Sequence, residues 1–145
     1  MSAMMRRRGF LALALAASVS AWGADKVPLD ENTVALFADL HVTQDKNNPH
    51  QSEGVARCVR DVLACNPRPA NVLLYGDLSF NRGDVGDYRL LKELLQPLDD
   101  AGIRWHACFG NHDRRATFLS VFPERQAQSP LAPDRLVSVV DTPHA

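Results

Sequence analysis

The chain has 145 residues, of which 46% are hydrophobic and 23% are charged, and its formal net charge is −1. These values are typical of a soluble globular protein with one modest core, and they exclude a disordered or fibrous protein. The small net charge gives no electrostatic reason to expect nucleic acid as a partner.

The first 23 residues have the pattern of an export signal. Three arginines at positions 6–8 precede an apolar run over residues 10–17, which is too short to span a bilayer as a helix. The run Arg-Arg-Gly-Phe-Leu within it resembles the twin-arginine export motif, and an ordinary secretory signal with extra arginines is the alternative. We therefore predict an export signal over residues 1–23, a linker over 24–32, no stable membrane span, engagement of the export machinery, and a periplasmic or secreted protein.

Apolar runs alternate with segments of helical periodicity along the rest of the chain. Buried strands are expected over residues 33–38, 71–75, 104–109 and 136–140. Helices are expected over residues 52–65, 87–101 and 113–122, the first of them capped by Ser52. This alternation predicts an α/β layered fold with a largely parallel sheet.

Three cysteines, Cys58, Cys65 and Cys108, contain no CxxC pair that would indicate a structural zinc site. Cys58 and Cys65 would lie two helical turns apart, about 10 Å at the rise of an α-helix. A disulfide requires Cα atoms within about 7 Å, so this pair is excluded on a regular helix. We expect all three cysteines to be small buried residues.

Potential metal ligands follow the first three expected strands. Asp39 and His41 follow the first strand, Asp77 follows the second, and Asn111 and His112 follow the third. Open α/β sheets usually bind their ligands at the carboxyl edge, so we expect these residues to form one site. Carboxylates and imidazoles favour zinc, iron or manganese over calcium, and a carboxylate such as Asp77 can bridge two ions.

The motifs Asp-x-His, Gly-Asp and Gly-Asn-His-Asp, taken in this order, resemble the first three motifs of the calcineurin-like metallophosphoesterases. The surrounding residues look most like the cyclic-nucleotide phosphodiesterase branch. The resemblance implies the first half of a layered α-β-β-α sandwich over residues 33–145, and two divalent transition metal ions. It implies that Asp39 and His41 ligate the first ion, that Asp77 bridges both, and that Asn111 ligates the second.

The resemblance also implies roles for other polar residues. His112 would act beside the leaving group as proton donor or phosphate ligand, and Asp113 would orient its neighbours. Arg82 could bind the substrate phosphate, as a nearby arginine does in related phosphatases, with a solvated turn residue as the alternative. His106 lies inside an apolar run and is expected to be a hydrogen-bonded core histidine. Relatives also use a further histidine and a Gly-His-x-His motif. That motif does not occur up to Ala145, and His144, the one histidine after the third motif, is expected to be a loop residue, with a metal ligand as the alternative.

Together these residues predict hydrolysis of a small phosphomonoester or phosphodiester by a metal-bound hydroxide, with a site complete only in a longer parent protein. The alternative is a truncated or degenerate relative that binds metal or phosphate without turnover. A dinucleotide-binding domain is disfavoured, because no Gly-x-Gly-x-x-Gly follows the first strand.

Overall fold

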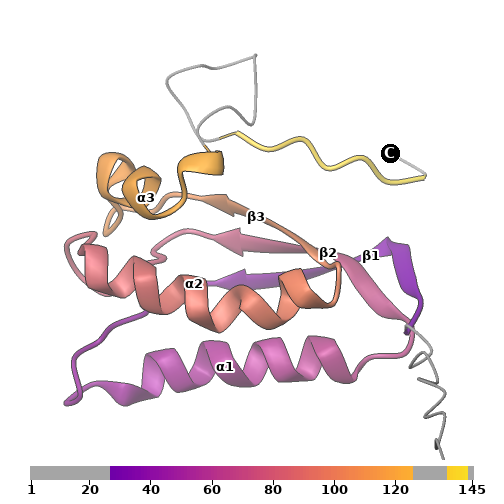
Figure 1. Ribbon diagram of the computed structural model, residues 1–145, viewed down its shortest axis with the longest axis horizontal. Coiled ribbons are helices and arrows are strands. Elements are labelled where there is room, and N and C mark those ends of the chain that lie inside the picture. Colours follow the sequence, from indigo (N-terminus) through magenta and orange to yellow (C-terminus); the bar gives the residue numbers. More distant parts are fainter. Residues whose placement is uncertain (1–26, 126–136, 144–145) are drawn as a thin grey trace, which may run out of the picture.

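The computed structural model describes residues 27–125 and 137–143. Strands and helices alternate along this part of the chain: β1 (Leu29–Ala38), α1 (Pro49–Ala64), β2 (Arg68–Tyr75), α2 (Val85–Asp100), β3 (Arg104–Cys108), α3 (Arg115–Val121) and the short 3₁₀ helix η1 (Pro123–Arg125). The three strands form one sheet in the order β1-β2-β3, and both pairings are parallel (Figure 1). The predicted α/β fold with a parallel sheet is confirmed.

The helices α1 and α2 pack on one face of the sheet (Figure 1). Alternate residues of each strand point into this layer, because successive side chains of a strand face opposite sides. The buried core joins strands and helices through apolar side chains: Phe37, Val55, Val59, Val72, Leu74, Leu91, Leu95, Trp105 and Ala107. Each large side chain contributes about 1.5–3 kcal/mol when fully buried, so this layer holds the three strand ends in fixed relative positions.

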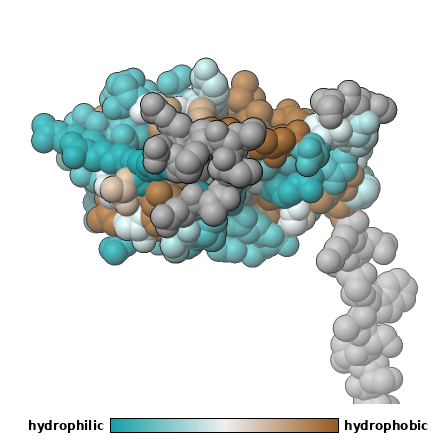
Figure 2. Space-filling view, turned by 90° about the horizontal axis from the view of Figure 1, so that it is seen from above, coloured by the Kyte–Doolittle hydropathy of each residue, from teal (hydrophilic) through white to brown (hydrophobic). Residues whose placement is uncertain are grey.

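The opposite face of the sheet carries the intervening residues and is more open. Leu36 and Tyr75 are 63% and 66% exposed. Val137 and Val140 lie against part of this face, where they line a cavity of about 440 Å³ together with Tyr75 and His106. Apolar residues accordingly interrupt a largely hydrophilic surface when the molecule is viewed from above (Figure 2).

The predicted fourth strand over residues 136–140 is wrong, because residues 137–143 are not part of any strand. Val139 is 62% exposed. An apolar, β-branched run favours a strand only where it fits beside a partner strand, and this segment pairs with none of the described strands.

Several predicted element boundaries also differ from the structure, among them the starts of β1, α1 and β2. The strand β1 begins at Leu29, inside the predicted linker, because Leu29 pairs with Arg68 at the start of β2. The helix α1 begins at Pro49, a residue suited to the first helical turn, rather than after Ser52. The Ser52 hydroxyl instead donates to the carbonyl of Thr43 and accepts from its N–H.

The cysteines are less buried than expected. Cys58 on α1 and Cys65, directly after its last residue, are exposed, Cys108 is half-buried, and all three are free thiols. The expectation of burial is wrong because the apolar face of α1 is formed by Val55, Val59 and Val62, which leaves both exposed cysteines outside it.

The predicted export signal, residues 1–23, lies outside the described residues and stays a prediction. Among the helices that the structure describes, none is long and apolar enough to span a membrane.

Candidate active site

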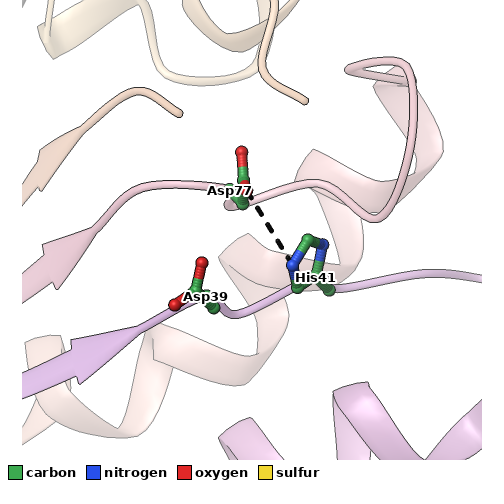
Figure 3. A group of neighbouring side chains, drawn as sticks. All are labelled: Asp39, His41 and Asp77. Atoms are coloured by element: carbon green, nitrogen blue, oxygen red, sulfur yellow. Dashed lines mark ion pairs between the residues drawn. The ribbon is translucent and has the colours of Figure 1, made fainter. Parts of the chain in front are cut away.

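Asp39, His41 and Asp77 come together just beyond the carboxyl ends of β1 and β2 (Figure 3). One ligand atom from each residue lies within 4.8 Å of the other two. The Nε2 atom of His41 is 3.9 Å from Oδ2 of Asp77. The loops themselves are joined, since the His41 N–H donates to the Asp77 carbonyl at 2.7 Å. The predicted convergence of the first two motifs is confirmed.

All three residues of this cluster have a left-handed backbone conformation. The φ angle is 51° at Asp39, 45° at His41 and 42° at Asp77. Such angles are uncommon outside glycine, and aspartate and histidine tolerate them better than most residues. Backbone strain of this kind costs about 1–3 kcal/mol per residue and concentrates at functional sites. The packed sheet below the loops holds the chain in this conformation.

The backbone carbonyl of Phe80 orients two imidazole rings. It lies 3.3 Å from Nδ1 of His41 and 2.6 Å from Nδ1 of His112. A carbonyl can only accept, so each Nδ1 carries a proton, and a neutral ring of this tautomer has its lone pair on Nε2. This tautomer suits His41 as a metal ligand. The two rings meet edge to face with centroids 4.9 Å apart.

The third motif reaches the cluster through its backbone. The N–H of His112 donates to Oδ1 of Asp77 at 2.9 Å. Gly110 lies so close that a Cβ atom there would be 2.1 Å from Oδ1 and 2.4 Å from the backbone N of Asp77. Glycine is therefore required at this position by the close approach of the two loops.

Asp113 joins the loop after β2 to the turn after β3 through hydrogen bonds, as its predicted orienting role requires. Its carboxylate accepts hydrogen bonds at 2.9–3.0 Å from the backbone N–H groups of Leu78, Ser79 and Gly110 and from the hydroxyl of Tyr88. The Tyr88 hydroxyl in turn accepts from the N–H of Arg114 at 2.9 Å. Burial raises the pKa of Tyr88 above its usual range, so the phenol stays protonated and donates to Asp113.

We expect Tyr88→Phe to lower the free energy of unfolding by about 1–2 kcal/mol, because it leaves the Arg114 N–H without its acceptor and Asp113 without one donor. Urea unfolding would measure the change. Tyr75→Phe is the matched control, since Tyr75 is 66% exposed and its loss of a hydroxyl should have almost no effect. Equal effects of the two substitutions would contradict the role given to Tyr88.

The remaining predicted site residues lie outside the cluster of Asp39, His41 and Asp77. His112 contacts the cluster, whereas Asn111 in the same turn and Arg82 in the loop after β2 are exposed, and no described contact joins either residue to the cluster. Their metal and substrate roles stay predictions. His106 is half-buried, and its Nε2 lies 3.2 Å from Oδ1 of Asn71. Burial is the main cause that lowers the pKa of His106, and the positive charges of nearby arginines lower it further. The prediction of a hydrogen-bonded histidine there is confirmed.

The donors of the cluster fit a divalent transition metal ion. They comprise two carboxylates and an imidazole whose Nε2 is free of the proton on Nδ1. Two ligand atoms about 2.0–2.2 Å from one ion can be at most about 4.4 Å apart, so the three side chains, whose ligand atoms lie within 4.8 Å of one another, need to close by only a few tenths of an ångström around an ion. The side chains of Asp77 and His41 are 14% and 26% exposed and Asp39 is exposed, so the cluster is partly shielded and open to a ligand.

A model of the calcineurin-like phosphoesterase family matches residues 33–141. This span contains all three motifs and every residue of the cluster. No curated protein matches the chain. The family match and the Asp-His-Asp cluster agree on metal-dependent chemistry at phosphate esters, and the chain belongs to the calcineurin-like phosphoesterase family.

Proposed function

We propose that this protein hydrolyses a small phosphomonoester or phosphodiester at a centre of two divalent transition metal ions, iron, manganese or zinc. Asp39 and His41 would hold the first ion, Asp77 both, and Asn111 the second. The observation that carries the proposal is the convergence of three ligand atoms within 4.8 Å. When bound, such ions polarise the phosphate and lower the pKa of water.

The residues of the chain itself would position the substrate and move the proton. His112 is held on both sides, by its N–H on Asp77 and by its Nδ1 on the Phe80 carbonyl. Only Nε2 of this ring is left to meet the substrate. We propose that the ring acts as the imidazolium, with one proton on Nδ1 for the Phe80 carbonyl and one on Nε2 for the leaving oxygen. Arg82, two residues beyond Phe80 along the same loop, is the candidate for binding a phosphate oxygen.

The test is His112→Asn, because the asparagine amide can still donate to the Phe80 carbonyl while Nε2 is lost. We expect hydrolysis of aryl phosphate and bis-aryl phosphate esters by the full chain with manganese to fall about 100-fold, the usual contribution of a general acid. Manganese binding measured by calorimetry should change little. His50→Asn is the matched control, since His50 is exposed on α1 with a side chain 88% accessible.

The outcomes separate the proposals. Equal activity of the His112→Asn and wild-type proteins would rule out His112 as proton donor. Tight manganese binding by a wild-type chain that hydrolyses neither ester would favour the non-catalytic alternative, a protein that binds metal or phosphate without turnover.

A further inference from the structure

We propose that Arg114 and Arg82 form a second anion-binding site beside the metal cluster, so that the preferred substrate carries another phosphate group besides the one that is hydrolysed. This inference rests on the proposed function of the cluster. It adds a substrate class, phosphate esters with a second phosphate, and a residue, Arg114, that would select it. It also assigns Arg82 to this second phosphate and not to the one that is hydrolysed.

The two arginines belong to the same loops as the cluster. Arg82 lies two residues after Phe80, and the Phe80 carbonyl binds both histidine rings. Arg114 follows His112 by two residues. Two residues of extended chain span at most about 7 Å, so both arginine side chains start close to the histidines.

A surface pocket of about 320 Å³ lies between these loops and is lined by both arginines: Arg82, Gly83, Asp84, Val85, Arg114 and Thr117. Gly83 allows the loops to meet, because its φ is 64° and a Cβ atom there would lie 2.6 Å from the Arg114 backbone N. That N–H is also fixed on the Tyr88 hydroxyl at 2.9 Å. The backbone of Arg114 is therefore held in place, while its side chain and that of Arg82 are exposed.

The charge of the pocket favours an anion. It holds two guanidinium groups against one carboxylate, that of Asp84. Within residues 27–125 and 137–143, neither Arg82 nor Arg114 forms an ion pair. Guanidinium groups bind phosphate through paired, charge-assisted hydrogen bonds. The arginine pocket would therefore attract a second phosphate.

The experiment compares two non-hydrolysable probes, propylphosphonate and propane-1,3-bisphosphonate, which differ only in the second anionic group. Their affinities for the full chain are measured by calorimetry at one saturating manganese concentration. We expect the wild-type protein to bind the bisphosphonate about tenfold more tightly, as one added charge-assisted contact would give. Arg114→Gln and Arg82→Gln should each reduce this preference to about threefold or less, and Arg89→Gln, an exposed residue of α2, should keep it.

Circular dichroism would show whether each variant is folded. Because the two arginines are replaced separately, the test still stands if one of the two variants does not fold. Equal affinities of wild-type protein for the two probes, with aryl phosphate hydrolysis intact, would overturn this inference and leave the proposed function standing. An equal loss of preference in Arg114→Gln and Arg89→Gln would also overturn it, because general charge would then explain the effect. Failure of the wild-type protein to bind either probe or to hydrolyse the ester would overturn both proposals.

Discussion

Replacing Asp77 by asparagine should lower phosphate ester hydrolysis about 1,000-fold and remove tight manganese binding, because loss of a single stabilising group in an active site already costs about 100–1,000-fold. Asp77 contacts residues of both the first and the third motif. One carboxylate oxygen accepts the N–H of His112, and the other lies 3.9 Å from Nε2 of His41. Asparagine lacks the negative charge and has only one oxygen.

The substitution should leave the fold intact. Asparagine adopts left-handed angles readily, so the φ of 42° at this position is accessible to it. Its single oxygen can still accept from His112. We therefore expect calorimetry to show lost metal affinity while urea unfolding changes by no more than about 1 kcal/mol. Asp100→Asn at the exposed end of α2 is the matched control, and wild-type manganese affinity in Asp77→Asn would remove Asp77 from the ligand set.

The position of the cluster could be predicted from the sequence, because it depends on a simple property of the fold. The ends of parallel neighbouring strands lie side by side, so residues that follow β1 and β2 must meet. The motifs after those strands then specify which side chains arrive there. The register confirms this logic, with Ala38 paired to Tyr75 at the ends of the two strands.

The contacts that orient the cluster could not be predicted in the same way. The carbonyl of Phe80 binds two histidines only because the loop after β2 folds back over them, and no pattern of residue types encodes the direction of a backbone carbonyl. A histidine in a metal site usually has a second partner for its other ring nitrogen, but the sequence does not say which group supplies it. The exposure of Cys58 and Cys65 could not be predicted either, because cysteine is small enough for either side of a helix.

Replacing Gly110 by alanine should lower the free energy of unfolding by about 2–3 kcal/mol and weaken metal binding with it, because the added methyl group would overpack a closed contact. The new Cβ would lie 2.1 Å from Oδ1 and 2.4 Å from the backbone N of Asp77. Oδ1 could rotate away only by giving up the N–H of His112, and the backbone N cannot move without shifting the loop that carries Asp77. The stability of the fold and the geometry of the cluster therefore change together.

Gly54→Ala is the matched control, since it adds the same methyl group where the structure has room. Gly54 lies inside α1, and its Cβ would meet nothing within 4 Å. Alanine restricts the unfolded chain and favours the helix, so this substitution should raise the free energy of unfolding by about 0.5–1 kcal/mol. Urea unfolding should thus give opposite signs for the two variants. If Gly110→Ala were as stable as the wild-type protein, the loops after β2 and β3 would have to be farther apart than the contact between Gly110 and Asp77 allows.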